Sequence, residues 1–118
     1  MIWHLIPQAD YLALGPDEPV RPASLASEGF IHCTGDLAVL RVVADKFYRS
    51  VPGAFLVLEI DPDRLTAPVK YEAPAPPPPP GDPLAQHRFP HIYGPLNRAA
   101  IVGVRPVQRA ADGTFLTV

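Results

Sequence analysis

Proline constrains this chain more than any other residue type. The 118 residues include 17 prolines, and seven of these lie within residues 73–83, five of them in a row from Pro76 to Pro80. Because proline fixes φ and lacks a backbone N–H, this run cannot join a helix interior or a central strand. We expect Pro76–Pro80 to form polyproline II, roughly 15 Å long at ~3.1 Å per residue. A stiff surface connector is the favoured role, and docking of a proline-binding partner is the alternative.

Short apolar runs, each ended by proline, glycine or a polar turn, predict strands in the rest of the chain. The predicted strands are Ile2–Ile6, Gly29–Cys33, Ala54–Ile60, Val69–Glu72 and Ala99–Val107. Ala54–Ile60 is apolar on both faces except at Glu59, which favours a central strand. Thr114–Val118 is expected to pair with Ala99–Val107 as a terminal hairpin, and residues 15–29 are expected to form a loop.

One main helix is predicted at residues 34–50. Leu37, Leu40, Ala44 and Phe47 recur at helical spacing, and Thr34 is a suitable N-cap. Strands together with one helix predict an α+β fold. The length suits a single domain over residues 1–118, with a proline-rich loop at 73–83.

Composition narrows the classes of function. The net charge of −2 and pI near 6.0 give no overall basic surface for nucleic acid or for an anionic membrane. A single cysteine, Cys33, excludes an internal disulfide and a multi-cysteine zinc site. The first residues lack the features of a signal peptide, and no apolar run approaches the ~20 residues that span a bilayer. We therefore expect a cytoplasmic protein.

Two histidines lie on predicted strands. His4 shares a face with Ile2 and Ile6, so it is either a core histidine bonded to a carbonyl or part of a site. His32 directly precedes the predicted helix, whose N-terminus could attract an anion, although Asp36 would oppose one. Cys33 faces the other way from His32 and is expected to be a buried, inert thiol.

A carboxylate and an aromatic segment complete the candidate residues. Glu59 interrupts an apolar strand, so it must be paired, lie at an edge or belong to a site. In the stretch RFPHIYGPLN, two prolines exclude a helix, and an extended chain would place Phe89, His91 and Tyr93 on one face. These rings could stack on a planar ligand or pack onto the core. No metal site is expected, because Pro90 prevents the helix that a His87–His91 spacing would need.

Four stretches in this order and spacing resemble the bacterial domain-of-unknown-function family numbered 952. They are IWHLIP, SLASEGFIHCT, LVLEIDPDRL with VKYE, and FPHIYGPLN, and the resemblance runs from Ile2 to Val107. The family's fold is similar to that of the ADP-ribosyltransferase superfamily. The resemblance therefore implies two small mixed sheets around a cleft that holds NAD or a related nucleotide, with the 34–50 helix packed on one sheet.

The resemblance also suggests roles for the candidate residues. His4 would bond the ribose, and Phe89, His91 and Tyr93 would bind the ligand. The superfamily's late catalytic glutamate has no counterpart here, so His32, Glu59 and His91 are the catalytic candidates. Two functions stay open: an enzyme of the glycosyl- or ADP-ribosyl-transfer or hydrolysis type, and a non-catalytic module that senses a nucleotide or binds a protein. Either requires His4, His32, His91 and Tyr93 to converge on one pocket.

Overall fold

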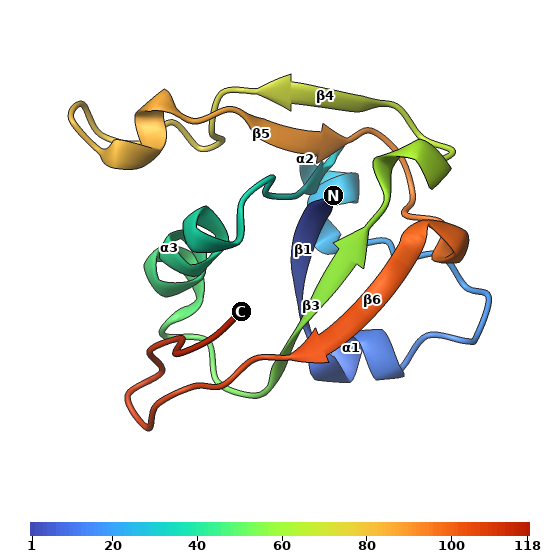
Figure 1. Ribbon diagram of the computed structural model, residues 1–118, viewed down its shortest axis with the longest axis horizontal. Helices are drawn as coiled ribbons and strands as arrows, with labels where there is room; N and C mark the ends of the chain where they lie inside the picture. Colours follow the sequence, from blue (N-terminus) through green and yellow to red (C-terminus); the bar gives the residue numbers. More distant parts are fainter.

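The computed structural model describes residues 1–118 and contains two three-stranded sheets (Figure 1). The first sheet has the order β1-β3-β6, and the second has the order β2-β5-β4. Their strands are β1 (Ile2–Pro7), β3 (Phe55–Ile60) and β6 (Ile101–Pro106), and β2 (Ile31–His32), β5 (Phe89–Ile92) and β4 (Val69–Glu72). The α+β prediction and the central place of β3 are confirmed.

Every strand pair is antiparallel, so the expectation of mixed sheets was wrong. Parallel neighbours need a crossover connection, usually a helix that joins two strands of one sheet. The long helix of this chain, α3 (Leu37–Tyr48), instead leads from β2 in the second sheet to β3 in the first.

The main helix is shorter than residues 34–50, because its cap is Asp36 rather than Thr34. The Asp36 carboxylate accepts hydrogen bonds from the backbone N–H groups of Ala38 and Val39, at 2.8 and 3.2 Å. Thr34 stays extended and exchanges two backbone hydrogen bonds of 2.8 Å with Trp3 of β1. Residues 31–34 thus join the two sheets, since β2 pairs with β5 and Thr34 pairs with β1.

Two further helices are short: α1 (Gln8–Leu12) and α2 (Ala23–Glu28). The second lies inside residues 15–29, which we expected to be a loop. Pro22 precedes it and Gly29 ends it with a left-handed φ of 88°, the usual arrangement of these two residue types at helix ends. The remaining helical segments are 3-10 turns at Pro62–Arg64, Pro83–Gln86 and Arg98–Ala100.

The space between the two sheets is a packed core rather than a cleft. Ile2, Ile6 and Leu58 of the first sheet meet Ile31 and Ile92 of the second, all almost fully buried. On its other face the first sheet packs against α3, through a second cluster that includes Leu5, Leu40, Ala44, Phe55 and Phe115. The prediction that α3 packs on a sheet is confirmed, while the cleft lies elsewhere, at the side of the sheets.

The proline-rich loop and the C-terminus also differ from expectation. The chain bends at Ala75–Pro76 and turns at Pro80–Gly81, so an unbroken extended run from Pro76 to Pro80 is not formed. The C-terminal hairpin follows β6 instead of pairing with it: Arg109 bridges to Phe115. Its buried Phe115 completes the second core cluster. None of the helices has the length and apolar character needed to cross a bilayer.

Candidate functional site

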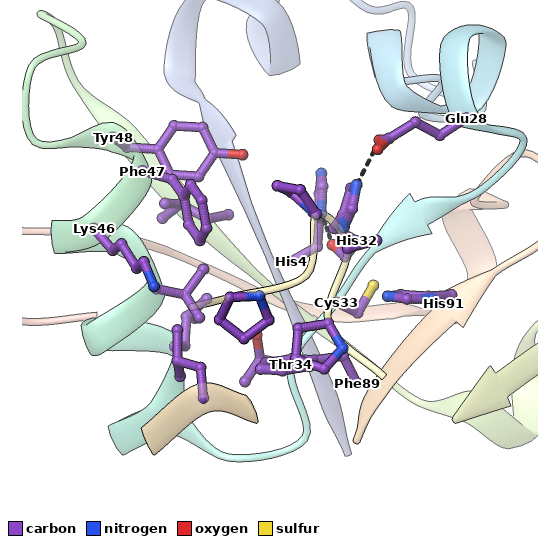
Figure 2. A pocket seen from close by; sticks show the side chains of 18 residues that line it. His4, Glu28, His32, Cys33, Thr34, Lys46, Phe47, Tyr48, Phe89 and His91 are labelled. Atoms are coloured by element: carbon purple, nitrogen blue, oxygen red, sulfur yellow. Dashed lines mark hydrogen bonds and ion pairs between the residues drawn. The ribbon is translucent and has the colours of Figure 1, made fainter. Parts of the chain in front are cut away.

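A cavity of about 310 Å³ opens beside the sheets, where β1, the end of β2, α3, β5 and the proline-rich loop meet. Figure 2 shows Lys46, Phe47 and Tyr48 of α3 on one side, with His4, His32, Cys33 and His91 on the other. Pro74, Ala75, Pro76 and Pro78 contribute a further wall. Its lining is therefore largely apolar, with imidazole groups gathered at one end.

The cavity runs along the free edge of β1. His4 and Leu5 are neighbours whose side chains point to opposite faces of the sheet, yet both line the cavity. Trp3 directs its N–H and C=O away from β3, toward Thr34. Because backbone groups alternate along an antiparallel strand, Leu5 directs its N–H and C=O to the same free edge. Neither Leu5 group has a partner in the chain, so this edge offers one donor and one acceptor to a ligand.

His4 presents a lone pair at the cavity. Its Nδ1–H donates to the backbone carbonyl of His32 at 2.7 Å, which leaves Nε2 as the unprotonated nitrogen. Burial lowers the pKa of His4 to about 4, since the charged imidazolium loses hydration; the bond to the His32 carbonyl acts in the opposite direction, and the nearby His32 ring lowers the pKa further. His4 is therefore a neutral hydrogen-bond acceptor at neutral pH.

His32 and His91 meet as predicted. They are cross-strand partners in β2 and β5, and their ring centroids lie 5.4 Å apart. Ile31 and Ile92 fill the core, so the alternation of side chains places both histidines on the outer face of the second sheet. The Nε2 atom of His32 lies 2.6 Å from the carboxylate of Glu28, at the end of α2. This carboxylate fixes the orientation of the His32 ring at the cavity.

His91 belongs to a hydrogen-bonded trio with Glu72 and Tyr93. Its Nδ1–H donates to the Glu72 carboxylate at 2.9 Å, and the Tyr93 hydroxyl donates to the same oxygen. These bonds lower the pKa of Glu72, with Tyr93 as the larger cause, and the bond to Glu72 raises the pKa of Tyr93. The other nitrogen of His91, Nε2, is buried and has no partner. One ring face of His91 stacks on Phe30, with a centroid separation of 4.1 Å.

Not every predicted site residue reaches the cavity. His4, His32, Phe89 and His91 line it. Tyr93 does not line the cavity, and its hydroxyl is bonded to Glu72. Of the four residues expected to converge on one pocket, the three histidines therefore do so and Tyr93 does not. Glu59 lies in β3 beside Trp3 and Gly103, away from the three histidines, and is not part of the lining.

Sequence reasoning missed several residues of this site. Glu28 ends a helix that was not predicted, and Glu72 gave no signal because its partner is 19 positions away. Phe47 was assigned to the inward stripe of α3, but it is 46% exposed at the cavity. An aromatic side chain left this open next to a cavity provides a surface on which a flat ligand can stack.

Two other features bear on the chemistry of the site. Burial strongly raises the pKa of the Cys33 thiol, which makes it a poor nucleophile. No group of three or more histidine, cysteine or acidic side chains is placed to hold a metal ion. The chemistry on offer is thus hydrogen bonding and stacking, together with two carboxylate–histidine pairs.

This α+β domain with a side cavity belongs to a family described as protein of unknown function (DUF952), whose model matches residues 5–104. The match confirms the resemblance to family 952 seen in the sequence, whereas a similarity to ADP-ribosyltransferases is not shown. The fold is similar to the crystal structure of protein CC0527 from Caulobacter crescentus, with a TM-score of 0.73, 22% identity, and coverage of 97% of this chain and 91% of that chain. A double-mutant form of that protein gives the same values. At this identity the likeness concerns the fold alone. No curated protein matches the chain.

Proposed function

We propose that the cavity binds the nicotinamide nucleoside half of NAD or a related nucleotide. The observation that carries the proposal is the free edge at Leu5, whose N–H and C=O are unpaired beside an otherwise largely apolar cavity. A carboxamide on a flat ring offers the complementary acceptor and donor, and Phe47 offers a stacking surface. His4 Nε2 would accept a hydrogen bond from a ribose hydroxyl, in agreement with the role that the family resemblance implies.

The size and charge of the cavity support one half of a dinucleotide rather than the whole. About 310 Å³ lies at the lower end of the ~300–1,000 Å³ found for small-molecule sites. Lys46 is the only lysine or arginine in the lining. A pyrophosphate and a second nucleoside would therefore extend out of the cavity mouth.

Thermal unfolding with matched ligands tests the proposal. Nicotinamide riboside and NAD should each stabilise the protein, by about 2.7 kcal/mol at roughly 100 times Kd, whereas ADP-ribose, which lacks the nicotinamide ring, should stabilise it less. His4→Leu should weaken binding of both nicotinamide ligands. His87→Leu is the matched control, because His87 is exposed and outside the lining. Equal stabilisation by ADP-ribose and NAD, or none by any ligand, would refute the proposal.

A second candidate function, hydrolysis of the bond between nicotinamide and ribose, is favoured by the Glu28–His32 pair. Among the expected catalytic residues, His32 and His91 line the cavity and Glu59 does not, but Glu28 supplies a carboxylate within the lining. A carboxylate there could stabilise positive charge on the ribose as the bond from its anomeric carbon to nicotinamide breaks and neutral nicotinamide leaves. Water would then bond to the same carbon and release one proton to solvent. Chromatography of NAD incubated with wild type and with Glu28→Gln tests this function. Absence of nicotinamide release by wild type would exclude this function, and release that the substitution leaves unchanged would exclude Glu28 from it.

A further inference from the structure

Lys46 links the cavity to the proline-rich loop. It lies in the last turn of α3, lines the cavity, and forms an ion pair with Asp82, whose side chain is only 17% exposed. We name residues 73–86 the proline strap, since they run from the end of β4 across the cavity to the 3-10 turn Pro83–Gln86. The ion pair is thus a contact between α3 and the strap at the cavity.

Asp82 has two tasks in the strap. One carboxylate oxygen caps the 3-10 turn by accepting a 2.9 Å bond from the N–H of Leu84, and the other meets Lys46. The hydrogen bond from Lys46 is the main reason that the pKa of Asp82 is lowered, so the carboxylate is ionised at neutral pH. Leu84 is 5% exposed and lines the cavity. The contact with Lys46 therefore holds the strap residues that cover the ligand space.

The charges at the cavity suggest a second role for this ion pair. Lys46 is the only lysine or arginine in the lining, and it is already paired with the carboxylate of Asp82. A ligand phosphate at the cavity mouth would require the same ammonium group. Phosphate and the Asp82 carboxylate are thus competitors for one cation, and exchange between them would free the strap end that carries Leu84.

We propose that Lys46 is the residue that binds the phosphate of a phosphorylated ligand, and that Asp82 occupies Lys46 until that phosphate displaces it. This inference rests on the proposed function, because it takes the nicotinamide nucleoside as the part of the ligand inside the cavity. It adds that the ligand is a nucleotide, and that binding its phosphate is coupled to release of the strap.

The affinities of nicotinamide riboside and of its 5′-phosphate, measured by calorimetry, separate the two proposals. Asp82→Asn removes the charge but keeps an N-cap, since asparagine caps as well as aspartate. It should raise affinity for the phosphate about two- to fivefold, the range expected for a partly exposed ion pair, and leave the riboside unchanged. Lys46→Gln should abolish the difference between the ligands. Asp112→Asn is the matched control, because Asp112 pairs with Arg49 at the end of the same helix, away from the cavity.

Each outcome decides the matter. If Lys46→Gln keeps the advantage of the phosphate, the phosphate binds elsewhere and the inference is wrong. If Asp82→Asn raises the affinity for both ligands equally, strap opening alone controls ligand entry, and competition between phosphate and Asp82 is refuted. If wild type binds the riboside and its 5′-phosphate with equal affinity, the inference fails while the proposed function stands. If wild type binds neither ligand, both fail.

Hydrogen exchange without ligand gives an independent check. The backbone N–H groups of Asp82 and Ala85 are bonded within the strap, to Pro79 and Asp82. Exchange at residues 81–86 should be faster in Asp82→Asn than in wild type and unchanged in Asp112→Asn, because only the first substitution releases the strap from α3. Equal exchange in all three proteins would show that Lys46 does not hold the strap, and would overturn the inference.

Discussion

His4 should make the stability of this protein fall in mild acid. His4 is 7% exposed as a residue, and burial lowers its pKa from 6.5 to about 4 in the folded state. In the unfolded chain the same imidazole is hydrated and titrates near ~6.5. Between these two values the unfolded state binds a proton that the folded state does not. The stability that neutral His4 provides at higher pH is therefore lost as the pH falls from about 6.5 toward about 4.

The size of this effect follows from the two pKa values. A difference of 2.5 units corresponds to about 3 kcal/mol when the whole window is crossed. At about pH 5 the linkage relation gives a loss of roughly 2 kcal/mol relative to about pH 8. For a domain of this size, that loss lowers the melting temperature by roughly 10 °C. The effect is large enough to be measured in one denaturation series.

Urea unfolding of wild type and His4→Gln between pH 8 and 5 tests this prediction. Glutamine can still donate to the His32 carbonyl, but it does not titrate. Glu72, Asp82 and Asp112, whose pKa values are lowered, are present in both proteins, so their contributions cancel in the difference. Wild type should lose about 2 kcal/mol more than the variant on acidification. Parallel pH profiles would refute the reasoning, because His4 would then titrate alike in the folded and unfolded states.

Three further predictions concern the folded framework. Arg109 donates to five backbone carbonyls near the end of α3. Arg109→Ala should therefore lower the free energy of unfolding in urea by about 3 kcal/mol, and Arg109→Lys should restore less than half of that loss. Gly113→Ala should lower the free energy of unfolding by more than ~3 kcal/mol, because the new Cβ would lie 2.1 Å from the Arg49 carbonyl oxygen at a φ of +92°. Gly53→Ala is the control: its φ is +102° but the space around it is open, so it should cost about 1 kcal/mol. Burial raises the pKa of Cys33, so its thiol should react with a disulfide reagent only after unfolding; rapid reaction of the native protein would contradict its placement.

Local patterns predicted the strands well, because their signals are short-range. Val69–Glu72 was predicted with its observed bounds, and Phe55–Ile60 differs from the predicted strand by one residue. Alternation along the strand also placed Phe89 and His91 on one face, where both line the cavity. Strand boundaries follow from proline, glycine and apolar runs, all of which are visible within a few residues.

The errors arose where a residue's partner is distant in the sequence. Thr34 is a residue type that caps helices well, but its backbone is hydrogen-bonded to Trp3, 31 positions earlier in the sequence. Asp36 caps the helix instead. The proline run was predicted from local propensity as one extended segment, but the chain bends at Ala75–Pro76 and turns at Pro80–Gly81, where the Asp82 N–H donates to the Pro79 carbonyl. Glu59 was a site candidate because it interrupts an apolar strand and because the superfamily's late glutamate has no counterpart here, and no local pattern shows that it lies outside the cavity lining.

The segment from Ile31 to Thr34 explains why the histidines meet at all. Its first half pairs with β5, which sets His32 beside His91, and its end pairs with β1, which brings the His32 carbonyl within 2.7 Å of His4. Three imidazoles from three strands are thereby fixed by one four-residue connection. Packing alone does not require this, because each buried imidazole needs hydrogen-bond partners of its own, and His91 Nε2 lacks one. Leaving this buried acceptor unpaired costs stability, so packing and hydrogen bonding alone do not explain why the three rings share one place.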